Sequence, residues 1–247
     1  MRPCKQLFVF NALAVLALSA GAAAQVPFHD HFDTTINPGW VVKNGASSVQ
    51  NGWLHLIDTN PGFPRWSCMT LNEGDTTWRD YQFQTRFDPI LTPSALGGPW
   101  MRGGMLWRST DWSGPTSTAY GLQFVLPGDS SGTSRLDFTR QINGDSGVML
   151  QQITPFTPTL PIDVVVYANG HHIKVYINGS LLIDVVDVGG PLSGGVGIWN
   201  VWESEGRYDD VTLTLLPPFC AGDADGNGAV EFSDITQVLS NLGAMCP

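Results

Sequence analysis

The sequence is short of positive charge. Its 247 residues include 12 lysines and arginines but 22 aspartates and glutamates, which gives a formal net charge of −10. An acidic surface repels a phosphate backbone, so nucleic acid is disfavoured as a partner. Acidic surfaces suit extracellular calcium and neutral glycans, although most acidic proteins use their charge only for solubility.

Long apolar runs are also scarce, and no segment after the N-terminal region is apolar enough to cross a membrane. At the N-terminus, Arg2 and Lys5 precede an apolar run, and Ala22-Ala23-Ala24 follow it. This order predicts a secretory signal peptide over residues 1–24. A membrane anchor is the alternative, but the run is short for a bilayer. We therefore predict a secreted protein, extracellular or attached to a cell surface, without membrane insertion.

Cysteine is rare as well, with four in the chain. Cys4 would leave with the signal peptide. Cys220 and Cys246 bracket a short segment with little core of its own, and in an oxidising compartment we predict that they form a disulfide. Closing that loop would contribute on the order of 3 kcal/mol in the chain-entropy model. For Cys68 we favour a small buried thiol in a strand over a catalytic nucleophile, because no Cys/His motif surrounds it.

Between these two cysteines, oxygen-bearing side chains recur at the spacing of a calcium-binding loop. Calcium takes six to eight hard oxygen ligands, and Gly228 at the sixth position permits the sharp bend. An acidic surface turn is the alternative, since Asp, Asn and Gly are common turn residues. The regular spacing favours calcium as the cofactor. The predicted ligands are Asp223, Asp225, Asn227, the carbonyl of Ala229, Glu231 (directly or through water) and Asp234.

One amphipathic helix is predicted directly after this loop. Ile235, Val238, Leu239 and Leu242 fall at helical spacing and form a single apolar stripe. Ser233 is suited to cap the start of this helix, and a glycine at position 243 is suited to end it.

The loop and helix together resemble one half of a dockerin, the module that attaches secreted enzymes to cohesin scaffolds. Aspartate at the twelfth loop position, Asp234, agrees with dockerins. Two features depart from the family: only one repeat is present, and Glu231-Phe232-Ser233 replaces the Ser/Thr-type pair often used to recognise cohesin. The resemblance covers about the last tenth of the chain. It implies calcium binding and a cohesin-like or cell-surface protein as a partner.

The body of the chain predicts an all-β fold. Short alternating or apolar runs recur between glycine- and proline-rich turns, without a helical period between them, which is typical of a sandwich or barrel. Asn169-Gly170 and Asn178-Gly179 each separate β-rich runs, and Asn-Gly is a strong hairpin signal. Residues 162–186 are therefore predicted to form a three-stranded antiparallel meander.

Several segments of this body are similar to the concanavalin-like and laminin-G-like jelly rolls. These segments are Gly103–Arg108, Tyr120–Gln123, His172–Asp184, Pro191–Trp199 and Tyr208–Thr214. The resemblance implies an antiparallel jelly-roll β-sandwich over residues 25–216, with one concave sheet. The dockerin-like calcium loop and helix would then occupy residues 217–247. It also implies that glycans are bound or cleaved on the concave face or at the rim loops.

The sequence lacks the carboxylate array of the glycosidases that share this fold. Retaining members place carboxylates about 5 Å apart through an E-x-D-x-x-E strand, and no such run is present. Arg108, Tyr120 and Gln123 resemble strands of the keto-glycoside hydrolase type, but Gly121 stands where the acidic residue would be. His171 and His172 are adjacent and would point to opposite faces of a strand. We therefore predict no catalytic residues.

Glycan binding needs flat aromatic faces and a few polar groups to orient hydroxyls. Residues on strands that would line the concave sheet are the predicted ligand-binding set. Core positions are an equally good interpretation of the two tryptophans in this set. The set consists of Trp107, Arg108, Tyr120, Gln123 and Trp199. Four further tryptophans lie in or near glycine- and proline-rich segments: Trp66, Trp100, Trp112 and Trp202.

A second calcium site is predicted where the first and last strands of the body would meet. In jelly rolls of this kind the terminal strands run close together, and a structural calcium often lies between their carboxylates. The residues would be Asp30, Asp33, Asp209 and Asp210. Solvated aspartates at strand ends are an equally good interpretation.

These features together predict a secreted, carbohydrate-associated protein that binds a polysaccharide or glycan without hydrolysing it. Its C-terminal segment would serve as a calcium-binding attachment tail. Two alternatives stay open. One is a polysaccharide hydrolase or lyase whose catalytic residues converge from loops, and the other is a cell-surface adhesion or structural module.

Overall fold

The computed structural model describes residues 28–57, 66–90, 100–112, 117–127, 132–144, 147–201, 205–216, 230 and 232–240. The predicted signal peptide, Cys220, Cys246 and five of the predicted calcium ligands, Asp223, Asp225, Asn227, Ala229 and Glu231, lie outside these residues. Those predictions are therefore not addressed by the structure.

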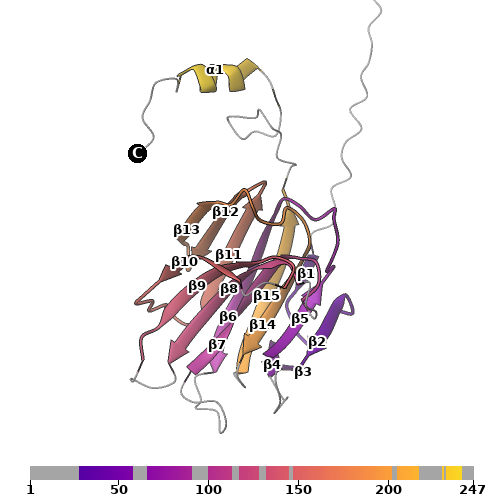
Figure 1. Cartoon of the computed structure of the whole chain (residues 1–247). Helices are drawn as coiled ribbons and strands as arrows, with labels where there is room; N and C mark the ends of the chain where they lie inside the picture. The colour runs from indigo at the N-terminus through magenta and orange to yellow at the C-terminus, as the bar shows by residue number, and fades with distance from the viewer. Residues whose placement is uncertain are drawn as a thin grey trace, which may run out of the picture.

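Two antiparallel sheets pack face to face (Figure 1), which confirms the predicted β-sandwich. The eight-stranded sheet runs in the order β13 (Ser180–Val186), β12 (His172–Ile177), β11 (Ile162–Asn169), β6 (Tyr81–Ile90), β15 (Glu205–Leu215), β4 (Trp53–Ile57) and β3 (Ala46–Gln50), with β1 (Phe28–Asp30) paired to β15. The seven-stranded sheet runs in the order β10 (Val148–Ile153), β9 (Arg135–Gln141), β8 (Ala119–Pro127), β7 (Trp100–Ser109), β14 (Gly195–Val201), β5 (Trp66–Leu71) and β2 (Trp40–Asn44).

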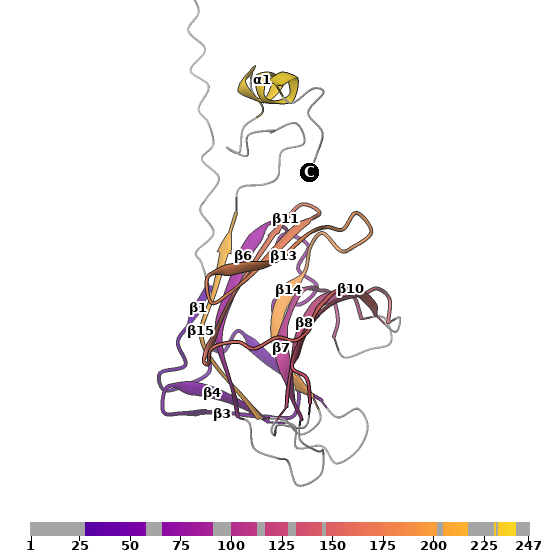
Figure 2. The ribbon, with the colours of Figure 1, turned by 90° about the vertical axis from the view of Figure 1, so that its left-hand side faces the viewer.

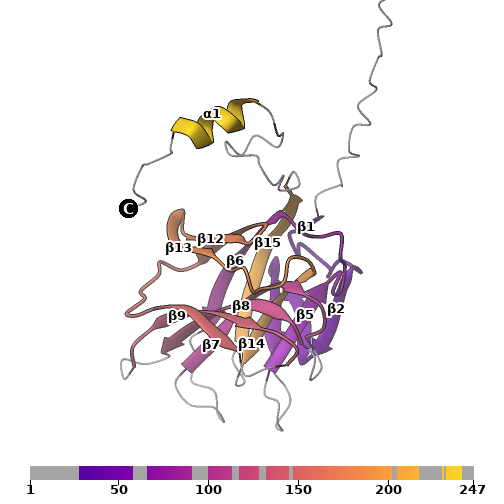
Figure 3. The ribbon, with the colours of Figure 1, turned by 45° about the horizontal axis from the view of Figure 1, so that its top comes forward.

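The sandwich has one aromatic-rich core between its sheets. Strand β6 alternates strictly between buried and half-buried residues, so Tyr81, Phe83, Thr85 and Phe87 face inward while the residues that alternate with them face outward. Across the interface, the Phe87 ring stacks on that of Phe124 from β8 with centroids 5.3 Å apart. Seen from above in Figure 3, β12, β6 and β15 form one layer and β9, β8, β7 and β14 form the other.

The predicted meander is present as β11, β12 and β13. Its second turn is Asn178-Gly179, and both residues have positive φ, 48° and 78°, as a type I′ hairpin requires. The first turn is shifted by one residue from the predicted pair. Asn169 pairs with His172, so the two loop residues are Gly170 and His171, and only Gly170 needs the positive φ of 53°.

One helix is described, α1 (Phe232–Ser240), in agreement with the predicted helix after the loop. It begins at Phe232, one residue before the predicted cap. Ile235 and Leu239 of the predicted apolar stripe are exposed, whereas Asp234 is buried. Within the described part of the chain, no helix combines the length and apolarity that a membrane crossing needs.

Candidate functional site

The outer face of the seven-stranded sheet is the surface that the ligand-binding prediction concerns. Figure 2 shows the two sheets edge-on, and the β10 side of the seven-stranded sheet curves away from the other layer. This curvature makes the outer face concave. The strand register decides which predicted residues reach it.

Trp107 and Tyr120 do not reach this face. They pair across β7 and β8 and point into the core, where neither has exposed surface. The Trp107 ring stacks on those of Tyr120 and Phe138, with centroids 5.7 Å and 5.5 Å apart. The Tyr120 hydroxyl donates to Asp187 at 3.0 Å, and burial raises the pKa of this phenol. A side chain without exposed surface cannot stack on a sugar, so both residues leave the ligand set.

Arg108 is also buried, and its contacts are structural. Its backbone has a positive φ of 51°, and its guanidinium donates to the carbonyl oxygens of Arg79, at 3.0 and 3.2 Å, and Pro191, at 3.1 Å. The Asp80 carboxylate lies 3.7 Å away. Burial lowers the pKa of the guanidinium. Arg108 therefore holds neighbouring loops to the end of β7, and it too leaves the ligand set.

Gln123 and Trp199 belong to the outer face. Gly104 on β7 pairs with both of them, with Gln123 on β8 and with Trp199 on β14. No side chain fits between them, since a Cβ on Gly104 would lie 1.9 Å from the carbonyl oxygen of Leu122. At Gly104 the outer face therefore presents bare backbone, with the Gln123 amide on one side and the half-buried Trp199 indole on the other.

A tyrosine from the other sheet holds this row from behind. Tyr208 of β15 crosses the core, accepts a hydrogen bond from the Gly104 N–H at 3.2 Å and lies 2.8 Å from the Trp199 carbonyl oxygen. The same hydroxyl lies 2.8 Å from the side-chain oxygen of Asn200. These contacts fix the backbone on both sides of the bare position.

A carboxylate continues the row toward the β10 edge. Asp137 on β9 pairs with Gln123 and Gln152 and is 3 % exposed. One of its oxygens accepts from Gln152 Nε2 at 2.7 Å, and the other accepts from Arg135 Nε at 2.9 Å. Asp137 itself is nearly buried, and it holds the side chains of Arg135 and the exposed Gln152 in place on this face.

Arg102 on β7 brings a second guanidinium to the same face. It shares a row with Val125 and Arg135 across β7, β8 and β9. Burial lowers the pKa of Arg102, the positive charge of Arg135 lowers it further, and Asp137 acts in the opposite direction. The face therefore presents donors and acceptors of both signs along adjacent strands.

Sequence reasoning missed four members of this polar group: Arg102, Arg135, Asp137 and Gln152. The alternation in β9 could have revealed part of it, because Arg135, Asp137 and Thr139 alternate with the buried Leu136 and Phe138. What the sequence does not give is the register that sets these residues beside Gln123.

Aromatic surface adjoins the polar row at its other end. Trp112, in the segment after β7, contacts Trp199 with ring centroids 5.8 Å apart and planes at 62°. Glu73 anchors this segment by accepting from the Trp112 N–H at 2.5 Å and from the Ser109 hydroxyl at 3.0 Å. Both indoles are partly exposed. Of the other tryptophans predicted near loops, Trp66 and Trp100 begin strands β5 and β7, and Trp202 is not among the described residues.

Gly121 lies on this face as well, paired with Leu106 and Thr139. A Cβ at this position would lie 3.1 Å from the Thr139 hydroxyl, so little space is available for a side chain. The position where keto-glycoside hydrolases would carry an acid is therefore bare. Among the described residues of this face, Asp137 has both oxygens engaged by hydrogen-bond donors, an arrangement that suits binding better than proton transfer.

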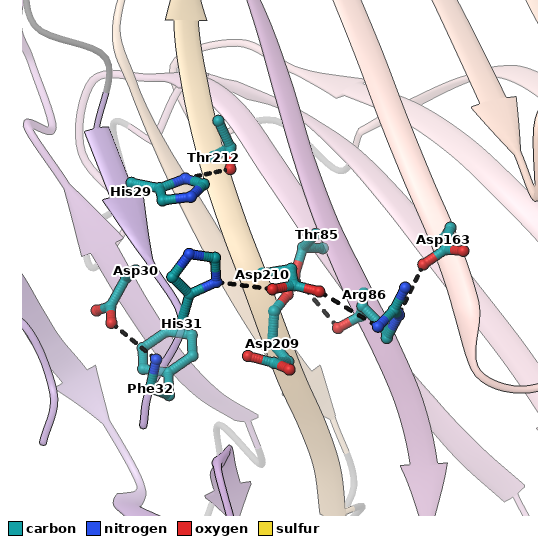
Figure 4. A network of polar contacts seen from close by, with 10 residues as sticks. All are labelled: His29, Asp30, His31, Phe32, Thr85, Arg86, Asp163, Asp209, Asp210 and Thr212. Atoms are coloured by element: carbon teal, nitrogen blue, oxygen red, sulfur yellow. Dashed lines mark hydrogen bonds and ion pairs between the residues drawn. The ribbon is translucent and has the colours of Figure 1, made fainter. Parts of the chain in front are cut away.

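The first and last strands do run together, as the second calcium prediction required, but the carboxylates do not converge (Figure 4). Asp30 is buried and accepts from the Phe32 and Asn37 N–H groups and from Trp40 Nε1, at 3.0, 3.1 and 3.0 Å. Its oxygens thus face hydrogen-bond donors rather than a cation.

The remaining three aspartates of that prediction are separate from Asp30 in their contacts. Asp210 accepts from His31 at 2.8 Å and lies 3.2 Å from a guanidinium nitrogen of Arg86. Burial raises the pKa of Asp209, and Asp33 is exposed. No group of three metal-ligating side chains occurs anywhere in the described ranges. Asp30 and Asp210 therefore serve hydrogen bonds and ion pairs in this structure, whereas one side-chain oxygen of Asp209 is buried without a hydrogen-bond partner among the described residues. The second calcium site stays a prediction.

We expect His31 to make stability depend on pH. The hydrogen bond with Asp210 raises the pKa of His31 above 6.5 in the folded protein. A raised folded pKa adds stability that is fully present below the unfolded pKa and is lost as pH rises through the folded pKa. Urea unfolding between pH 5.5 and 8 should show a steeper loss of stability for the wild type than for His31→Gln. Asp210→Asn should flatten the profile similarly, and parallel profiles for all three proteins would contradict this assignment.

Cys68 is a buried free thiol in β5, as predicted, and burial raises its pKa well above the usual value. A thiol that resists ionisation is a poor nucleophile. This confirms the structural interpretation of Cys68.

No protein-family model matches the chain, and neither does any curated protein sequence. Solved structures do match. The carbohydrate-binding module CBM66 from Bacillus subtilis aligns at 18 % identity and a TM-score of 0.51, over 71 % of this chain and 95 % of that one. A prokaryotic β-1,3-1,4-glucanase (lichenase) derived from a mouse hindgut metagenome aligns at 13 % identity and 0.56, over 77 % and 99 %. The exoplasmic/lumenal domain of VIP36, in a Ca²⁺/Man3GlcNAc-bound form, aligns at 13 % and 0.52, over 76 % and 88 %. At such identities the matches establish the fold alone, a concanavalin-like or galectin-like jelly roll.

Proposed function

We propose that the protein is a secreted, carbohydrate-associated protein that binds a glycan on the concave face of the seven-stranded sheet without hydrolysing it. The observation that carries this proposal is the row formed by Gln152, Asp137, Gln123, the bare Gly104 and Trp199. Fixed donors and acceptors can orient sugar hydroxyls, and the Trp112–Trp199 pair offers apolar ring surface beside them.

The structural neighbours support a glycan as the ligand class, since a carbohydrate-binding module, a lectin domain with bound Man3GlcNAc and a lichenase share the fold. Because glucanases are among them, hydrolysis is the second candidate. Gly121 and the engaged oxygens of Asp137 favour binding. A glycan array with the mature protein, followed by a reducing-sugar assay on each hit, separates these functions. Release of product would establish hydrolysis, and silence in both assays would favour an adhesion or structural module.

Trp199→Ala should weaken binding to any array hit by about tenfold, which corresponds to about 1.4 kcal/mol of lost contact. The indole is partly exposed at the end of the row, so its loss removes ring surface from the ligand. Affinity electrophoresis or calorimetry measures the change. Val41→Ala, an exposed position on the edge strand β2 of the same sheet, is the matched control and should bind like the wild type. Unchanged affinity in Trp199→Ala would remove the site from this end of the face.

For the C-terminal segment, residues 217–247, we propose calcium-dependent attachment to a cohesin-like or cell-surface protein. The support is the ligand spacing from Asp223 to Asp234 and the flanking cysteines. Calorimetric titration with calcium should give one site in the wild type and none in Asp223→Ala, because the first loop position supplies a carboxylate ligand. Equal titration curves would defeat the assignment of this loop.

A further inference from the structure

A pocket of about 290 Å³ lies on the opposite side of the sandwich from the proposed glycan face. It is on the outer face of the eight-stranded sheet, over β11 and β12, and Leu216, which follows β15, also lines it. The lining residues are Tyr167, Asn169, His172, Lys174, Tyr176 and Leu216. The alternate residues of both strands, such as Val166 and Val175, fill the core. The core therefore does not require aromatic side chains on the outer side.

Two tyrosines provide ring surface in this pocket. The Tyr167 and Tyr176 rings lie 5.6 Å apart with planes at 74°, so they form a corner with one face and one edge. Both side chains are half-buried, so their conformational freedom is already restricted and contact with a ligand costs little further side-chain entropy. The apolar C–H face of a sugar ring packs on an aromatic face of this kind.

Asn169 supplies an unsatisfied polar atom at the same place. Its side-chain oxygen is buried and has no hydrogen-bond partner among the described residues. A buried acceptor without a partner is costly, so a turn of the Asn169 amide that lets this oxygen accept from a ligand in the pocket would be favourable. A sugar hydroxyl is such a donor.

The charges around the pocket are balanced, which selects against an anionic ligand. The amino group of Lys174 lies 3.7 Å from the Asp184 carboxylate, and His172 Nε2 is hydrogen-bonded to the same carboxylate. The hydrogen bond from His172 and the charge of Lys174 lower the pKa of Asp184, so this acid stays ionised. The amino group of Lys174 is therefore engaged within the protein rather than available to a phosphate or uronate.

We infer that the pocket formed by Tyr167, Tyr176 and Asn169 is a second carbohydrate site, which takes one sugar ring of a neutral glycan. The choice of a glycan as ligand rests on the proposed function, whereas the location is independent of it. With sites on opposite faces, one molecule bridges two glycan chains. Bridging raises avidity on a dense polysaccharide surface without any new contact.

The test uses the full mature protein and soluble oligosaccharides of glucose, mannose, galactose and fructose in calorimetry. Tyr167→Ala and Tyr176→Ala are each expected to weaken binding at one of the two sites by about tenfold, or about 1.4 kcal/mol. Tyr176→Phe keeps the ring and should retain binding. Asn169→Ser leaves both rings in place and should weaken binding without affecting the fold. Thr214→Ala, exposed on β15 of the same sheet, is the control.

A second readout separates this proposal from the first. Beads that carry a polysaccharide recognised by the protein should aggregate when the wild type is added. With Tyr167→Ala or Trp199→Ala the beads should bind protein but stay dispersed. Trp112 and Trp199 lie on the other face, so tryptophan fluorescence should report that site and remain unaffected by the tyrosine variants.

The outcomes are distinct. Wild-type affinity and bead aggregation in all tyrosine and asparagine variants would overturn the second site and leave the concave site intact. If Tyr167→Ala and Tyr176→Ala abolish all binding while Trp199→Ala binds like the wild type, the result would support the pocket and overturn the concave face. Absence of heat for every sugar with the wild type would overturn both.

Discussion

Trp107→Ala is expected to lower the free energy of unfolding by about 3–5 kcal/mol, the range for removal of a buried large aromatic side chain. The indole has no exposed surface and lies nearly parallel to the rings of Tyr120 and Phe138, at interplanar angles of 20° and 13°. Its removal opens a cavity in the core and breaks both stacks. Urea unfolding of the wild type and variant measures the loss.

This variant also separates core from ligand face. The glycan affinity of the folded fraction should match the wild type, because Trp107 points away from the concave surface. Trp199→Ala should give the opposite pattern, with weaker binding and a smaller loss of stability. Trp107→Phe retains a ring and should recover part of the stability. Near-normal stability with lost binding in Trp107→Ala would reverse the assignment of the two faces of β7.

Asp30→Ala is expected to cost about 3–5 kcal/mol, since each buried donor that loses its partner costs about 1–3 kcal/mol. The carboxylate accepts from Phe32 N–H, Asn37 N–H and Trp40 Nε1, and so ties the turn after β1 to the start of β2. Asp30→Asn keeps one acceptor oxygen and should fall between wild type and alanine. Urea unfolding measures all three proteins.

Asp33→Ala is the matched control for this experiment. Asp33 lies in the same turn but is exposed, so its loss should change stability by less than about 0.5 kcal/mol. Repeating the series with excess calcium and with a chelator tests the metal interpretation of this region. A calcium-dependent rise in wild-type stability that disappears in Asp30→Ala, but persists in Asp223→Ala, would establish a calcium site between the terminal strands.

Local sequence signals predicted several elements correctly. Asn178-Gly179 forms a two-residue turn because both residues tolerate the positive φ that matches the twist of a hairpin. In β6, the aromatic residues Tyr81, Phe83 and Phe87 mark the core side, although the polar Thr85 is buried on that side too. The helix α1 also followed from the spacing of its apolar residues.

The ligand face was less predictable, because β7 and β8 carry buried residues on both of their sides. In β8, Leu122 and Phe124 face the core, but Val125 on the other side is buried as well. Alternation then gives two faces without saying which one meets the second sheet. Trp107 and Tyr120 on one side, and Gln123 on the other, were equally good candidates until the sheets were in place.

The sequence alone determined the strands, the antiparallel meander and the spacing of oxygen ligands from Asp223 to Asp234, because each depends on neighbouring residues. Tertiary structure decided that Trp107 is core and Trp199 is surface, and that Asp30 accepts hydrogen bonds from its own turn. It also aligned Asp137 with Gln123 and set Tyr167 beside Tyr176. Register and sheet packing join residues distant in sequence, and these two properties fix what each face presents to a ligand.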